Sequence, residues 1–501
     1  MTLPTKPRFL FAGVARNALI TMACGALAGC NLAPHYRPPS AVPGGAPLPA
    51  TFKADPGWAV AQPSDDVAKG AWWQLFNDPV LDALEAKVVV NNQNVAAQRA
   101  AWMQARATAA QDKAALFPTV GVSASATHTG RFGGGQTTQI TGGQITTSNN
   151  NYTASASASW EPDLWGKLTN TLHEARAQAQ ATAADYANVT LSAQASLAND
   201  YMALRAIDAE IAVLDPAVLA ETQALRVTQN QYAAGTVSRA TVDSAEQTLA
   251  GERATRRDLD RDRAANEDAI AMLVGENPST FRLEADPAWQ PVVPEVPGVL
   301  PSRLLERRPD IAAAERSVAA ANAAIGVARA AFFPTVPLTG SVETTTGTLS
   351  SLFGAATSLW SLGASASETL LDFGARSAQL RGAKAAYDQA VANYRQTALA
   401  AFQAVEDNLA ARAAYADEAR EIAREAHAAD DAARISRAEL DAGTIDAATV
   451  SSAIATAATT RQSQIESTLN RQSAAIALIE AIGGTWSDAA TVPTAGPAVA
   501  H

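Results

Sequence analysis

The chain lacks most of the features that mark enzymes and disulfide-stabilised proteins. Only two of its 501 residues are cysteines, and both lie near the N-terminus, so no disulfide framework is available. The five histidines are scattered without metal-ligand spacing, and Gly133-Gly134-Gly135 lacks the Gly-Lys-Ser/Thr of a phosphate loop. We therefore expect no catalytic site, no cofactor and no metal site, and we do not expect an enzyme.

Other shortages limit the kind of fold and partner. The formal net charge of −11 argues against nucleic acid as a partner. After residue 30 no run of ~20 apolar residues occurs, so no transmembrane helix is expected. Aromatic residues make up only 6% of the chain, and alanine dominates the 48% apolar content. Because small side chains let helices approach closely, this composition favours a helical assembly over a globular core.

The N-terminal segment has the pattern of a lipoprotein signal. Basic residues and a short apolar run lead to Leu27-Ala28-Gly29-Cys30, which is a lipobox. We expect residues 1–29 to be removed as a signal peptide and Cys30 to carry the lipid, with Asn31 directing the protein to the outer membrane. An ordinary signal peptide with an incidental cysteine is the alternative. The proline-rich residues 30–70 are then a tether from the lipid to the body.

The body is organised around one long helical stretch, from about Gly166 to about Tyr232. An apolar heptad repeats along it, which is typical of helices packed side by side: Leu197, Leu204, Ile211, Val218, Leu225 and Tyr232. A helix of ~65 residues reaches on the order of 100 Å, so it must span a distance. Asp215-Pro216 interrupts the stretch without shifting the apolar register, which predicts a kink rather than an end.

The same stretch occurs a second time. Gly374, Tyr394 and Gly443 each lie 208 residues after Gly166, Tyr186 and Gly235, and a glycine turn at each end predicts a returning helix. We therefore expect two repeats, at 71–276 and 302–485. A proline-rich linker at 277–301 joins them, and residues 486–501 form a disordered tail.

Each repeat also contains two segments of alternating apolar and small polar residues. The first pair comprises 120–127 and 152–160, with a polar loop between them. The motif Phe117-Pro118-Thr119-Val120 returns as Phe333-Pro334-Thr335-Val336 and opens the second pair, 336–342 and 360–367. Strands of ~10 residues with one apolar face match those of outer-membrane barrels. An ordinary soluble hairpin is the alternative.

These elements predict a mainly helical α+β fold with four very long helices and four barrel strands per chain. Four strands cannot close around a lumen, because even a barrel filled with side chains needs ~8. Three chains would supply twelve strands and satisfy every strand edge. We therefore expect a homotrimer with a 12-stranded β-barrel and a 12-helix periplasmic tunnel.

Motifs across nearly all the mature chain resemble the TolC-like outer-membrane factors, specifically the NodT-type lipoproteins of tripartite RND-type efflux systems. The matching stretches are Pro34–Pro38, Trp72-Trp73 with Phe76 and Asp78-Pro79, Ser159–Gly166, Tyr201–Arg205, Leu300–Ile311 and Phe332–Pro334. The resemblance implies a trimer that passively conducts small toxic molecules (drugs, organic compounds or metal ions) from periplasm to exterior. It also implies a periplasmic adaptor, an inner-membrane pump and a location in the outer membrane.

Candidate gate residues lie near the two glycine turns. The resemblance implies a constriction closed by acidic, arginine and leucine side chains after the second turn, but residues 449–453 here lack the acid. Asp243 and Glu246 after the first turn, with Asp441 and Asp446 beside the second, are the candidates, because acidic rings select cations. The alternative is that these acids are a solvated helix face.

The turns themselves, with Gly235-Thr236 in one and Gly443-Thr444 in the other, are the expected contacts for the adaptor, because they are the exposed ends of rigid helices. Simple connectors are the alternative there. Two other functions remain open at this point. One is an outer-membrane channel for type I protein secretion, and the other is a non-channel coiled-coil surface lipoprotein, which would not explain the duplicated strand pairs.

Overall fold

A computed structural model describes residues 31–42, 71–130, 148–286, 289–296, 308–352, 354 and 358–484. The expected signal peptide, the lipid site at Cys30 and the tail 486–501 lie outside the described residues. So do residues 43–70 of the expected tether, residues 131–147 of the polar loop and residues 297–307, which include part of the linker.

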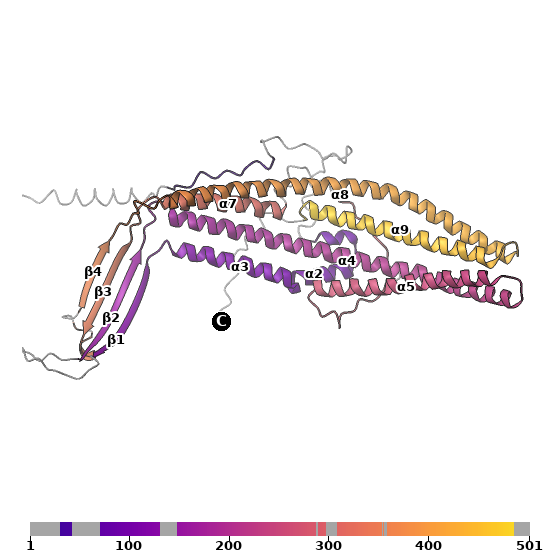
Figure 1. The fold of residues 1–501 in the computed structure, drawn as a ribbon, viewed down its shortest axis with the longest axis horizontal. Helices are drawn as coiled ribbons and strands as arrows, with labels where there is room; N and C mark the ends of the chain where they lie inside the picture. The colour runs from indigo at the N-terminus through magenta and orange to yellow at the C-terminus, as the bar shows by residue number, and fades with distance from the viewer. Residues whose placement is uncertain are drawn as a thin grey trace, which may run out of the picture. The chain divides into compact units, whose positions relative to one another are not determined.

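The described part of the chain is mostly helical (Figure 1). A short 3-10 helix, η2 (Trp72–Phe76), precedes the helices, and a second, η3 (Leu349–Ser351), lies in the second strand pair. The helices are α2 (Pro79–Asn91), α3 (Gln93–Ala114), α4 (Lys167–Ala233), α5 (Arg239–Leu273), α7 (Pro309–Ala330), α8 (Ala375–Asp441) and α9 (Ala447–Ala481). None of them has both the length and the apolar content needed to cross a bilayer.

The helix lengths confirm the internal duplication. Helices α4 and α8 are each 67 residues long, and α5 and α9 are each 35 residues long. Every start and end in the second pair lies 208 residues after its counterpart in the first pair. Pro216 lies inside α4, which continues past it as the apolar register predicts.

One helix expected to be continuous is broken. From the helix-start signal Asp78-Pro79 to about Leu116, the polar, alanine-rich sequence predicts a single helix, but α2 ends at Asn91 and α3 begins at Gln93. Asn92 between them has extended backbone angles. Its Oδ1 accepts hydrogen bonds from the backbone N–H groups of Asn94 and Val95, and its Nδ2 donates to the Leu273 carbonyl. The side chain thus starts α3 and joins it to the end of α5.

The strands form one antiparallel sheet in the order β1-β2-β3-β4, with β1 (Thr119–Gly130), β2 (Ser148–Trp160), β3 (Leu338–Thr346) and β4 (Ser358–Ala364). The second strand pair differs from the expected ranges 336–342 and 360–367: β3 begins two residues later and continues to Thr346, and β4 begins at Ser358 and ends at Ala364. Pro337, which has no backbone N–H, precedes β3, and beyond β4 only an isolated bridge joins Thr335 to Ser367.

In all three strand pairs, even-numbered residues are paired with even-numbered residues. Because side chains alternate between the two faces along a strand, all even-numbered strand residues therefore lie on one face of the sheet. This face carries the large apolar side chains, such as Val122, Trp360 and Leu362, which are 76% to 84% exposed. The opposite face carries mostly small residues, many of them polar, with Ser123 bonded to Ser155 and Ser341 to Ser361; Glu343 and Leu359 are exceptions. The alternation expected from the sequence is therefore present.

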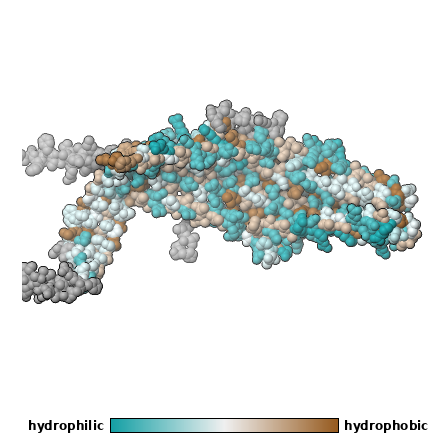
Figure 2. All heavy atoms as spheres, viewed as in Figure 1, coloured by the Kyte–Doolittle hydropathy of each residue, from teal (hydrophilic) through white to brown (hydrophobic). Residues whose placement is uncertain are grey.

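The chain divides into two units, and each takes segments from both repeats. One comprises residues up to 39, 104–179 and 316–392, and includes the sheet; the other comprises 40–103, 180–315 and 393 onward. The second unit holds the main apolar core, where Tyr201, Leu204, Ile476 and Leu478 are almost fully buried. Figure 2 shows hydrophilic residues spread over the helices, whereas the sheet is mostly pale, as its small serines and alanines require.

Candidate functional site

The two hairpin turns have the same backbone structure. Gly235 between α4 and α5 has φ +75°, and Gly443 between α8 and α9 has φ +74°. In each turn the glycine N–H and the following threonine N–H return to carbonyls of the last helical turn, at 2.9 Å in all four bonds. The hydroxyls of Thr236 and Thr444 donate to the same carbonyls as their backbone N–H groups. Each long helix is therefore closed by a glycine cap of the Schellman type.

Each returning helix starts with a side-chain cap. Ser238 caps α5 through the Thr241 N–H, and Asp446, its counterpart 208 residues later, caps α9 through the Thr449 N–H. Asp446 Oδ1 also accepts from the Thr449 hydroxyl at 2.7 Å. These bonds lower the pKa of Asp446 below its usual value, the hydroxyl bond contributing most.

The expected gate acids lie at both turns. Asp243 is 57% exposed and forms an ion pair with Arg239, with 2.9 Å between Nε and Oδ1. Glu246 and Asp441 are exposed, and Asp446 is the cap just described. Within one chain, two of these acids follow the first turn and two flank the second.

A buried contact that was not expected joins the α4–α5 hairpin to the α8–α9 hairpin, more than one helical turn away from the glycine turns. Glu221 on α4 is almost fully buried, and its Oε2 accepts a short hydrogen bond from the Ser451 hydroxyl on α9. Its other oxygen has no hydrogen-bond partner among the described residues. Ser451 lies in the stretch 449–453, where an acid was expected. The acid that contacts residues 449–453 is therefore Glu221, which belongs to the first repeat.

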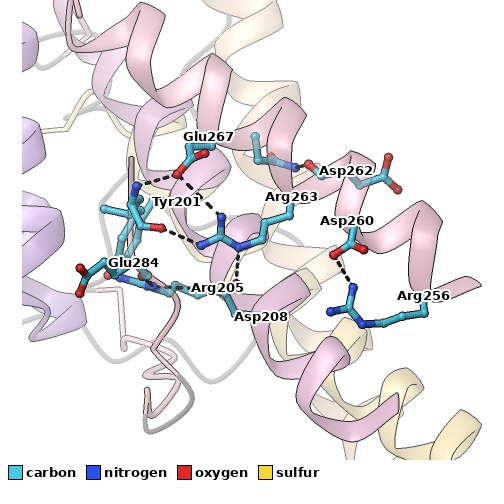
Figure 3. Close-up of polar contacts among 11 residues, drawn as sticks. Tyr201, Arg205, Asp208, Arg256, Asp260, Asp262, Arg263, Glu267 and Glu284 are labelled. Atoms are coloured by element: carbon cyan, nitrogen blue, oxygen red, sulfur yellow. Dashed lines mark hydrogen bonds and ion pairs between the residues drawn. The ribbon is translucent and has the colours of Figure 1, made fainter. Parts of the chain in front are cut away.

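A polar network at the base of the first hairpin fixes the inter-repeat segment (Figure 3). Arg205 on α4 donates through Nη1 to the Glu284 carbonyl at 2.8 Å, and Arg263 on α5 donates through Nη2 to the Leu283 carbonyl at 2.7 Å. Both arginines share Asp208, whose two oxygens accept at 3.3 and 2.7 Å. Glu267 on α5 completes the set by accepting from the Leu283 N–H at 2.6 Å.

The network continues to the start of the first repeat. Asp78 Oδ1 caps α2, while its Oδ2 accepts from the Tyr201 hydroxyl at 2.7 Å and from Trp289 Nε1 at 2.9 Å. Arg205 Nε in turn donates to the Tyr201 hydroxyl at 3.1 Å. Burial is the main reason that the pKa of Tyr201 lies far above its usual value. The motifs Asp78-Pro79 and Tyr201–Arg205, noted separately in the sequence, therefore meet here.

Another buried acid lies close to this network in sequence. Glu85 on α2 is fully buried, and neither of its carboxyl oxygens has a hydrogen-bond partner among the described residues. Burial first, and the charge of Asp82 second, raise the pKa of Glu85 to about 9. The side chain therefore keeps its proton at neutral pH. Nothing in the local sequence distinguishes it from a solvated glutamate.

The first residues of the expected tether are held against the body. The Leu32 carbonyl accepts from Arg329 Nη1 at 3.0 Å, and the Pro34 carbonyl accepts from Asn322 Nδ2 at 2.9 Å. Both donors lie on α7. A Cβ built on Gly326 of this helix would lie 2.7 Å from the Ala33 Cβ, so only glycine leaves room for the segment. Residues 31–39 are therefore a strap on α7 rather than a free tether.

No group of three or more His, Cys, Asp or Glu side chains in the described ranges is arranged to hold a metal ion. The arrangement offers rigid hairpins, an open sheet and buried polar ties, which are the parts of a scaffold rather than of a reaction centre. Sequence reasoning found the turns and their glycines, but it missed the cap at Ser238 and the ion pair of Arg239 with Asp243, which local spacings of three and four residues could have indicated. It also missed Glu221 and Glu85, which only tertiary contacts and burial distinguish.

Comparisons with known proteins agree with this picture. A family model described as outer membrane efflux protein matches residues 86–276 and 300–484. The chain is 29% identical over 418 residues to the probable efflux pump outer membrane protein TtgC of Pseudomonas putida strain KT2440, covering 80% of this chain and 82% of that protein. It is 27% identical over 396 residues to the cation efflux system protein CusC of Escherichia coli strain K12, covering 78% and 82%.

A solved structure is also similar along most of the chain. The crystal structure of the open state of the Neisseria gonorrhoeae MtrE outer membrane channel superposes with a TM-score of 0.76 at 25% identity. The match covers 91% of this chain and 98% of that one.

Proposed function

Because the chain belongs to the outer membrane efflux protein family, we propose that it forms a passive conduit for small toxic molecules from the periplasm to the exterior. The protein is an outer-membrane component of an efflux system and not an enzyme. One observation carries the proposal. Among the described residues the sheet is open, since β1 and β4 each have one neighbouring strand, and its even-numbered face is apolar.

An open apolar sheet requires further strands. Unpaired N–H and C=O groups at a strand edge cannot be left in hydrocarbon, so a membrane sheet has to close. Three copies would give a 12-stranded barrel whose apolar even-numbered face meets lipid and whose serine-rich face lines water. The same three copies would supply twelve helices for a periplasmic tunnel, because each copy has two helices of 67 residues and two of 35 residues.

The remaining assignments extend this proposal. Cys30 carries the lipid, and the strap at 31–39 holds the lipidated end to α7. The repeats extend over 71–276 and 302–485. The exposed turns at Gly235-Thr236 and Gly443-Thr444 receive a periplasmic adaptor, which connects to an inner-membrane pump. Asp243, Glu246, Asp441 and Asp446 surround the periplasmic entrance.

The relatives suggest the class of cargo. A second Pseudomonas putida protein with the same degree of identity is described as a toluene efflux pump component, and CusC belongs to a cation efflux system. Both organic compounds and metal cations are therefore proposed cargoes, and a sensitivity panel in cells lacking the protein separates them.

Planar lipid bilayers test the conduit directly. The purified full-length, lipidated protein should produce stepwise ion currents that detergent alone does not produce. The same preparation should run as a trimer in native mass measurement. A stable trimer that never conducts would contradict a channel and favour a non-channel surface lipoprotein.

A further inference from the structure

An aromatic contact within the chain joins the end of the first strand pair to the start of the second. Trp165, after β2, stacks on Phe333, before β3, with ring centroids 4.8 Å apart and 24° between the planes. Trp165 Nε1 also donates to the Pro334 carbonyl at 2.8 Å. Beside this contact, β2 and β3 are paired from Trp160↔Leu338 to Tyr152↔Thr346. The end of the first strand pair is thereby joined to the start of the second.

The duplication gives each of these residues a counterpart. Residues after the second strand of a repeat are related by 208 positions, so Trp165 corresponds to Phe373. Residues before the first strand are related by 216 positions, so Phe333 corresponds to Phe117. Both hairpins keep the same register under these offsets, because Thr119↔Ser159 in one becomes Thr335↔Ser367 in the other.

The counterparts lack the contact that their equivalents make. The Phe373 side chain is 93% exposed and that of Phe117 is 60% exposed. Phe373 also has φ +50°, in the left-handed region that a bulky side chain seldom adopts. The strand edges beside these two residues, on β4 and β1, have no partner among the described residues. The ends at Trp165 and Phe333 are thus joined within the chain, whereas the equivalent ends at Phe373 and Phe117, called the open pair below, are not.

We propose that the open pair is joined between copies by the arrangement that joins the first pair within a chain. Phe373 of one copy packs on Phe117 of the next, and β4 pairs with β1 of that copy. Applying both offsets to the β2–β3 ladder gives the register, in which Ala364 faces Ala126, Leu362 faces His128 and Trp360 faces Gly130. This inference rests on the proposed trimer and specifies its interface.

The proposed register keeps the faces of the sheet consistent. Even-numbered residues of β4 meet even-numbered residues of β1, so the apolar face continues from one copy to the next. A slip by one residue would set Ala364 opposite Ser125 or Thr127 and turn the faces over. A slip by two residues would preserve the faces but would displace the strand pairing from the register that places Trp165 on Phe333.

Disulfide crosslinking in the full-length lipidated protein tests the register. The variant A364C/A126C should form covalent links between copies on oxidation, because Cβ atoms of directly opposed residues lie ~4.5–5.5 Å apart. The shifted pair A364C/A124C is the matched control, since diagonal neighbours are ~7–8 Å apart. The equivalent pair within one chain, A156C/V342C, calibrates the yield, because Ala156 faces Val342 in the β2–β3 ladder.

The outcomes separate this inference from the proposed function. Native mass measurement first establishes whether the uncrosslinked protein is a trimer, and a protein that is not a trimer contradicts both. If trimers form, A364C/A126C should link with a yield close to that of the in-chain pair, and the shifted pair should not. A trimer in which the shifted pair links instead, or neither pair links while A156C/V342C does, overturns the register but leaves the conduit standing.

The aromatic contact has its own readout in the same trimers. F373A should lower the temperature at which trimers dissociate. F373W should not, because it introduces the tryptophan found at the equivalent position, Trp165, in the in-chain contact. F117A should lower it too, and F373A/F117A should lower it by less than the sum of the two changes, because both remove one contact. Additive effects, or no effect of F373A, would overturn the aromatic part.

Discussion

At Glu85, protonation is linked to stability. Its carboxyl group is fully buried beside apolar neighbours on α2, and its pKa is raised from 4.5 to about 9. At pH values below 4.5, the folded and unfolded chains both keep the proton, so the stabilising contribution is complete. As pH rises from 4.5 to about 9, only the unfolded chain releases it, and stability falls.

We therefore expect E85Q, which stays neutral, to be more stable than the wild type at alkaline pH. The difference should vanish near pH 4.5 and reach roughly 4 kcal/mol per chain at pH 7.5, from three pKa units at ~1.4 kcal/mol each. Apparent melting temperature as a function of pH measures it. The exposed Glu418 provides the control, E418Q, which should leave the pH profile unchanged. Parallel profiles for E85Q and the wild type would show that Glu85 is charged at neutral pH.

The gate acids make a second prediction at this scale. D243N with D446N should change the conductance and reduce the cation preference of the channel, because two negative charges per chain leave the proposed entrance. Asparagine caps helices as well as aspartate, so α9 should still start at the same residue. D258N with D417N removes the same charge from two other exposed acids and is the matched control. Unchanged currents in D243N/D446N would contradict the assignment.

At the scale of elements, rigid helices end in narrow turns. Both turns need a residue with positive φ, and at neither glycine would a Cβ meet another atom within 4 Å. The glycines are therefore required by backbone conformation and not by crowding. Left-handed backbone costs a side-chain-bearing residue roughly 1–2 kcal/mol, which is enough to reshape a turn without unfolding helices of 67 residues.

Replacing Gly235 and Gly443 with valine should accordingly abolish efflux in cells while leaving trimers intact, because a β-branched residue strongly disfavours the left-handed backbone of the turn. Efflux is measured as resistance to a toxic compound that the wild type exports, and trimers as native mass. Gly251 lies inside α5 with no positive φ and open space around it, so G251V is the control and should export normally. Normal export by G235V/G443V would mean that the turns are simple connectors.

At the scale of the whole molecule, duplication explains why one chain does not complete its sheet. Each repeat contributes two strands and a pair of long helices, and the in-chain contact of Trp165 with Phe333 closes one junction between repeats. A ring of repeats needs the same junction at every boundary, and the other boundary is left at Phe373 and Phe117. Bilayer currents and the A364C/A126C crosslink therefore test the same trimer. The currents test whether it conducts, and the crosslink tests how its copies are paired.

Much of the architecture was predictable because it depends on local periodicity. Heptads, period-two segments and turn glycines depend on neighbouring residues, so the lengths of α4 and α8, the sheet faces and the two caps agree with expectation. The break at Asn92 was not predictable, because its Nδ2 finds the Leu273 carbonyl 181 residues away. The strap at 31–39 was not predictable for the same reason, since the proline-rich composition gives no indication that Asn322 and Arg329 bind its backbone carbonyls.

The sequence by itself therefore determined the repeats, the long helices, the open set of four strands and the family. The tertiary structure alone decided which distant side chains meet, as when Tyr201 and Trp289 converge on Asp78 or when Glu221 meets Ser451. It also decided that Glu85 is buried without a partner. The physical reason is that helix and strand periods follow from consecutive residues, whereas a hydrogen bond or a burial depends on segments that only folding brings together.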